Sequence, residues 1–68
     1  MKTIKVKELE VPLEAMGDVA SILTENEITN SITGTDDDHE IVFIEVQFDK
    51  DEKDVIREIE EAISDYAD

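Results

Sequence analysis

The densest group of side chains that could do chemistry is an acidic run between two segments rich in apolar residues. It contains the single histidine of the chain and reads Asp36-Asp37-Asp38-His39-Glu40. Hard divalent cations prefer carboxylate oxygens, but the run lacks the alternating ligand positions and the glycine of a calcium-binding loop. Aspartate is also a common turn residue. We therefore interpret the run as a solvated hairpin loop and predict no metal site in it.

Groups suited to catalysis are sparse. The chain has no cysteine, and its serines lack the glycine-flanked turn that exposes a nucleophilic serine in hydrolases. A carboxyl group that acts as a general acid or base needs a cleft that shifts its pKa, and 68 residues enclose little such space. No glycine-rich phosphate-binding loop occurs. We expect a protein without enzymatic activity, cofactor or metal.

The charge of the chain restricts its partners. Twenty acidic and six basic residues give a formal charge of −14, whereas binding to a nucleic-acid backbone needs a basic surface. The same charge disfavours an anionic membrane surface, and the longest apolar run, 41–44, is far too short to span a bilayer. The first residues alternate and form no signal-peptide block. These features predict a cytoplasmic protein that binds proteins, and neither nucleic acid nor membranes directly.

Apolar residues recur with regular spacing, which predicts one folded domain over residues 1–68. Alternating apolar residues indicate strands, and apolar residues three or four apart indicate helices. In chain order we expect a strand at 4–11, a helix at 12–26, strands at 28–35 and 40–48, and a helix at 49–66. Asp49 followed by Glu52 resembles a capping box at the start of the second helix.

The strand at 40–48 is apolar on both sides, so we place it at the centre of the sheet. A right-handed crossover from the first strand leaves room for one strand beside it. The predicted fold is therefore α+β: a β-α-β-β-α open-faced two-layer sandwich with a three-stranded antiparallel sheet in the order 1-3-2 and two helices on one face. To the covered face we assign Ile4, Val6, Ile28, Ile32, Val42, Ile44, Val46 and Phe48. Leu9 and Val11 alternate in the opposite phase, which a bulge or strand end near residues 7–8 would explain.

The predicted outer face of the sheet carries residues that do not fit full solvation. Ile41 and Phe43 would lie there beside Glu45, and Lys5 or Lys7 would pair with Glu45 across the strands. Either long neighbouring side chains cover the two apolar residues, or the two form a contact patch for a partner.

The first functional hypothesis is a small acidic regulatory or binding module that acts through protein–protein contacts. The first strand would be an edge, able to pair with a second copy or with another protein. Lys2, Lys5 and Lys7 could instead be charges that protect this edge from pairing. The candidate contact residues are Ile41, Phe43, Glu45, Lys5 and Lys7.

The alternative is an acidic mimic of nucleic acid, as some phage-encoded inhibitors are, that blocks a basic nucleic-acid-binding protein. This function predicts carboxylates in one continuous stripe, whereas acids interrupted by Lys50, Lys53 and Arg57 would serve solubility alone. The candidate acids are Asp36, Asp37, Asp38, Asp51, Asp54, Glu58 and Glu61.

The pattern of elements and apolar positions resembles the ACT-like branch of ferredoxin-like domains. The matching positions are Ile4-Lys5-Val6, Pro12-Leu13, Val19, Leu23, Asn26, Ile28 and the segment 41–46. The resemblance implies a small regulatory module of the kind that binds amino acids, often at a dimer interface. Leu13 stands where such domains carry glycine, and the last strand has no counterpart, so no binding residue is carried over.

Overall fold

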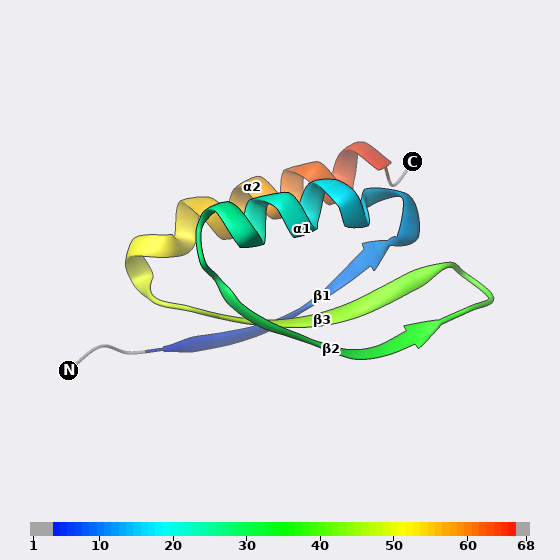
Figure 1. Cartoon of the computed structure of the whole chain (residues 1–68), viewed down its shortest axis with the longest axis horizontal. Coiled ribbons are helices and arrows are strands. Elements are labelled where there is room, and N and C mark those ends of the chain that lie inside the picture. The colour runs from blue at the N-terminus through cyan, green and yellow to red at the C-terminus, as the bar shows by residue number, and fades with distance from the viewer. Residues whose placement is uncertain (1–3, 67–68) are drawn as a thin grey trace.

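Two helices lie side by side on one face of a three-stranded antiparallel sheet in the computed structural model, which describes residues 4–66 (Figure 1). The elements are β1 (Lys5–Pro12), α1 (Met16–Glu25), β2 (Thr29–Asp36), β3 (Ile41–Phe48) and α2 (Lys53–Tyr66), with short 3₁₀ helices at Leu13–Ala15 and Lys50–Glu52. The strand order is β1-β3-β2. The predicted α+β fold, element order and sheet order are confirmed. Lys2, one of the possible edge-protecting charges, lies outside the described residues.

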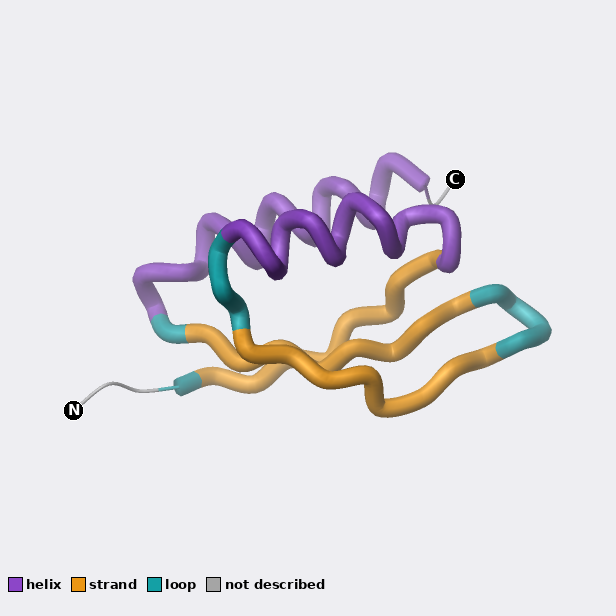
Figure 2. Tube along the Cα trace, in the orientation of Figure 1, coloured by secondary structure: helices purple, strands orange, loops and turns teal. Residues whose placement is uncertain are grey.

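β3 lies at the centre of the sheet because it is apolar on both faces. Its side chains at positions 42, 44, 46 and 48 are buried, and Ile41 and Phe43 on the other face are half-buried. β1 pairs with β3 along all eight of its residues, and β2 pairs with the other edge of β3. β2 contains a bulge between Ile32 and Gly34. Figure 2 shows the turn at residues 37–40 that closes the β2–β3 hairpin.

The buried face of β1 differs from the sequence prediction. Leu9 and Val11 are 4% and 0% exposed, whereas Ile4 and Val6 are 53% and 59% exposed. The register with β3 runs through residues 7–8 without a shift, so the predicted bulge is absent. Because side chains alternate along a continuous strand, β1 can bury only one of its two apolar sets. Leu9 and Val11 occupy the half of β1 next to the turn into α1, where they reach the core.

Two other large apolar residues are exposed, and one of them, Ile32, was predicted on the covered face. Ile32 lies on the edge strand β2 beside the bulge, and Leu13 lies in the 3₁₀ helix that precedes α1. A 3₁₀ helix has fewer residues per turn than an α-helix, so its side chains point in other directions than an α-helix would give them. Ala15 is therefore fully buried and Leu13 is exposed.

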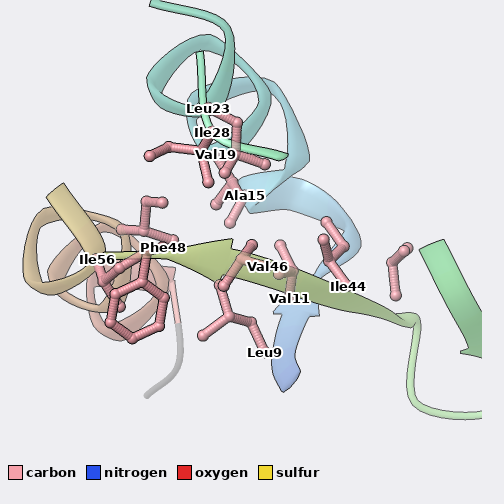
Figure 3. Close-up of a cluster of buried hydrophobic side chains, with 12 residues drawn as sticks. Leu9, Val11, Ala15, Val19, Leu23, Ile28, Ile44, Val46, Phe48 and Ile56 are labelled. Atoms are coloured by element: carbon pink, nitrogen blue, oxygen red, sulfur yellow. The ribbon is translucent and has the colours of Figure 1, made fainter. Parts of the chain in front are cut away.

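The hydrophobic core fills the space between the sheet and the helices (Figure 3). Its twelve buried residues are Leu9, Val11, Ala15, Val19, Leu23, Ile28, Val42, Ile44, Val46, Phe48, Ile56 and Ile59. Within residues 4–66 no polar or charged side chain is buried. The charge of the described chain therefore lies at its surfaces.

The predicted capping box forms ahead of α2. The backbone N–H of Asp49 donates to Glu52 Oε1 at 3.1 Å, and the backbone N–H of Asp51 donates to Asp49 Oδ1 at 2.9 Å. These bonds satisfy amide donors that the start of a helix leaves without partners. They also fix the direction in which α2 leaves the sheet, and α2 carries the charged residues of two of the surfaces described below.

Candidate interaction surfaces

The sheet face opposite the helices is the first candidate surface, which we call the open face. The register places there Val6, Glu8 and Glu10 of β1, Ile41, Phe43, Glu45 and Gln47 of β3, and Thr29, Ser31, Gly34 and Asp36 of β2. Apolar groups and carboxylates are mixed on this face. Within residues 4–66 it carries no lysine or arginine.

Phe43 is the largest apolar group on the open face. It stands between Glu10 on β1 and Gly34 on β2, and it is half-buried. A Cβ atom at Gly34 would lie 3.8 Å from the Phe43 ring, so the glycine leaves that side of the ring uncovered. Val6 on the same face is exposed. The predicted outward position of Ile41 and Phe43 is confirmed, and neighbouring side chains cover these two residues only in part.

The lysines of β1 do not belong to the open face, which corrects the prediction. Lys7 stands directly opposite the buried Val46, and Glu45 stands opposite Glu8. The predicted pair of Lys5 or Lys7 with Glu45 therefore does not form, because successive side chains along a strand point to opposite faces and Glu45 is next to Val46 on β3. Of the five candidate contact residues, the open face gathers three and the helix side of β1 takes the two lysines.

Two carboxylates face each other across strands on the open face. Glu8 and Glu45 are direct partners in the register, and like charges in that position are destabilising. Thr33 Oγ1 donates to Glu8 Oε2 at 3.2 Å, which is the one hydrogen bond that this pair receives from a side chain within residues 4–66. A positively charged group placed beside the pair would relieve the repulsion.

A second candidate surface is a groove of about 470 Å³ between β1 and α2, which we call the basic groove. Its lining residues are Lys5, Lys7, Phe48, Lys53, Ile56, Arg57, Glu60, Glu61 and Ser64. Lys7 Nζ lies 3.0 Å from Glu60 Oε2. The Lys53 side chain lowers the pKa of Lys5 through a hydrogen bond and charge repulsion. Sequence reasoning missed this surface because β1 and α2 are far apart in the chain.

The third surface is a hollow of about 420 Å³ between α1 and α2, which we call the acidic groove. It is lined by Asp18, Ser21, Ile22, Glu25, Glu58, Glu61, Ala62 and Asp65. Of the seven candidate acids it gathers Glu58 and Glu61 alone. The acids that sequence reasoning missed, Asp18 and Glu25, had a signal in the sequence: they are seven residues apart, and this spacing places them on one side of their helix.

The acidic loop is organised by its own hydrogen bonds. Asp36 Oδ1 accepts from the backbone N–H groups of Asp38 and His39 at 3.1 and 3.3 Å, and His39 Nδ1 lies 2.9 Å from Asp36 Oδ2. The hydrogen bond from the His39 side chain lowers the pKa of Asp36. Residues 4–66 contain no group of three His, Asp or Glu side chains placed to hold a metal ion. The loop lines a hollow with Leu13 and Ile41, apart from the acidic groove.

Tyr66 links the two helices, and its phenol provides a pH-dependent test of the helix arrangement. Tyr66 Oη donates to Asp18 Oδ2 at 2.8 Å, and this bond raises the pKa of Tyr66 above its ordinary value of 10.0. Because the folded pKa is raised, the contribution of the bond to stability is present below the unfolded pKa and is lost as the pH rises through the folded pKa. Ultraviolet titration of the single tyrosine should show the raised pKa. Asp18→Asn should lower it; an unchanged value would contradict this contact.

Comparison of the chain with protein-family models, with curated proteins and with solved structures gave no match in any of the three. Among residues 4–66, neither helix combines the length and the apolar content needed to cross a membrane.

Proposed function

We propose that the chain is a small non-enzymatic binding module of the cytoplasm that acts through protein–protein contacts made by the open face. The observation that supports this function is the composition of that face. Ile41 and Phe43 are neighbours on β3 without helix cover, Glu10 and Asp36 stand opposite them, and the exposed Val6 lies beyond the Glu8–Glu45 pair. Partly exposed apolar residues with a charged surround are typical of a contact surface.

The chemistry of the open face favours a partner with basic groups. Glu8, Glu10, Glu45 and Asp36 lie on it, and Glu8 repels Glu45 directly across the strands. A partner that brings lysine or arginine to this face would offset the repulsion, and the opposite charges would speed association. A second copy meeting the same face would instead add four more carboxylates. The ACT-like resemblance adds a regulatory role to the proposal, with contact to a partner as its mechanism.

Affinity capture from the source cell with three forms of the chain as bait tests this proposal. Wild type and Ile32→Ala should capture the same protein, and Phe43→Ala should lose it. Ile32 is the matched control because it is an exposed apolar residue of the same sheet whose side chain lies on the helix side. A captured protein that Phe43→Ala retains at the wild-type level would overturn the open face as the contact surface. Sedimentation of the purified chain shows directly whether the partner is a second copy.

The acidic groove favours a second function, mimicry of nucleic acid. Its five carboxylates come from both helices, and no basic residue lines it. They lie together across α1 and α2, but the stripe expected from the sequence is not continuous, because Asp51, Asp54 and the loop acids do not line this groove. Under this function the captured protein would bind nucleic acid, and duplex DNA would displace it. Glu58→Gln with Asp65→Gln would then weaken capture, while Phe43→Ala would not.

A further inference from the structure

The basic groove concentrates positive charge in an acidic chain. Four of the six lysine and arginine residues of the chain line it, together with two glutamates, so the lining has a formal charge of +2 while the chain carries −14. The side chains of Phe48 and Ile56 contribute apolar lining. Local charge dominates the potential felt inside a groove because more distant charges are screened beyond about 10 Å at 0.1 M salt.

Three of the four cations in the basic groove have no ion-pair partner in the part of the chain that the structure describes. Lys7 pairs with Glu60, but Lys5, Lys53 and Arg57 form no ion pair with any carboxylate of residues 4–66. Lys5 and Lys53 instead repel each other. Within residues 4–66, three cations around one groove thus have no carboxylate at ion-pair distance. An anion in the groove would remove this repulsion.

The basic groove also lies beside a free strand edge. β1 pairs with β3 on one side, and no strand within residues 4–66 pairs with its other edge. The side chains of Lys5 and Lys7 lie on the helix side of β1, where α2 faces them. A strand added to this edge would project every second side chain to the helix side, toward the cations of the groove.

We propose that an extended acidic segment of a partner protein binds along the free edge of β1, with carboxylates at alternate positions in the basic groove. Its backbone would hydrogen-bond to β1, and its alternate carboxylates would meet the four cationic side chains. A carboxylate of the segment would also compete with Glu60 for Lys7, since that ion pair is half-exposed and gains little from burial. The other side chains of the segment would extend the open face. The site is separate from the contact surface of the proposed function and does not depend on it.

The alternation of side chains along β1 argues against a second copy of the chain as the partner at the free edge of β1. Two β1 strands paired antiparallel about a two-fold axis perpendicular to the sheet place helix-side residues opposite helix-side residues. Lys5 and Lys7 lie on the helix side, whereas Glu8 and Glu10 lie on the open face. In no such register does a lysine of one β1 face a glutamate of the other. Self-pairing therefore supplies no counter-charge to the groove, and two chains of charge −14 repel each other.

Fluorescence polarisation with labelled peptides of the length of β1, eight residues, tests this proposal. The probe alternates glutamate with threonine. One comparison peptide has the same composition with the glutamates in one block, and another has lysine in place of glutamate. The full chain should bind the alternating peptide and bind the block peptide more weakly. The acidic surfaces can attract the lysine peptide, but loss of the groove lysines should not weaken its binding.

Two charge variants assign the binding to the groove. Lys5→Gln combined with Lys53→Gln should weaken binding of the alternating peptide about tenfold or more, because two charge-assisted contacts are lost. Lys50→Gln removes one positive charge outside the groove lining and should leave binding unchanged, whereas Lys53→Gln alone, which also removes one, should weaken it. Both positions of the double variant are exposed, so its circular dichroism and melting should match the wild type.

Four results of the peptide experiment would overturn the proposal. They are no binding of the alternating peptide up to millimolar concentration, equal binding of the block peptide, equal loss of affinity in Lys50→Gln, and displacement of the peptide by inorganic phosphate at a similar concentration. Equal binding of the block peptide or displacement by phosphate would mean that the groove binds negative charge and that the peptide does not pair as a strand with β1. Self-association that the double variant abolishes would identify a second copy as the occupant and would overturn it as well.

Discussion

Replacing Ile44 by alanine is expected to lower the free energy of unfolding by about 2–5 kcal/mol, the range for truncation of a buried isoleucine. Ile44 is 2% exposed and stands at the centre of the sheet, opposite Leu9 on β1 and Ile32 on β2. Domains of this size are stable by only about 3–10 kcal/mol, so the variant should be largely destabilised. Chemical denaturation monitored by circular dichroism measures the change. Ile44→Val, expected to lose about 0.5–1.5 kcal/mol, keeps the effect measurable if the alanine variant does not fold.

Phe43→Ala is the matched control, one residue away on the other face. Its ring is half-buried on the open face, so truncation removes fewer contacts than the 3–5 kcal/mol range for a phenylalanine in a core, and we expect a loss of about 1 kcal/mol. If Phe43→Ala destabilises the chain as strongly as Ile44→Ala does, Phe43 is buried and the open face is covered. The finding that both helices cover the same side of the sheet would then be wrong.

Moderate salt is expected to stabilise the fold. The formal charge of −14 makes the compact chain repel itself, and Glu8 opposite Glu45 adds a local like-charge pair. Raising sodium chloride from a few millimolar to about 0.1 M shortens the screening length to about 10 Å. The melting temperature should rise by several degrees, since about 1 kcal/mol corresponds to roughly 4–8 °C in a domain of this size.

The variant Glu45→Gln separates local from general repulsion in the salt experiment. It removes one member of the Glu8–Glu45 pair, so it should raise the melting temperature at low salt and show a smaller response to added salt. The ion pair between Lys7 and Glu60 is weakened by salt and opposes the trend, but an exposed pair contributes little. A melting temperature that stays constant or falls between low and moderate salt would contradict the expected repulsion.

Much of the fold could be predicted because each element carries a local signal. β3 alternates between Val42, Ile44 and Val46 on one side and Ile41 and Phe43 on the other, and this pattern predicted a central strand. The capping residues ahead of α2 and the apolar spacing within it predicted where that helix begins. A right-handed crossover then left one arrangement of the three strands. The spacing of apolar residues, the helix caps and the turns depend on residues close together in the chain, so the sequence alone determined these features.

The tertiary structure decided which face of β1 is buried and which charges meet. Val6 and Leu9 belong to alternating sets of similar apolar character, and only the position of the helices over the sheet selects the set with Leu9. That choice turned Lys5 and Lys7 away from Glu45 and toward α2, and so assembled the basic groove. A strand has no intrinsic preference between its two faces, because both satisfy its backbone equally. The burial of apolar area against the helices therefore determined the face, and with it the surface that we propose as a binding site.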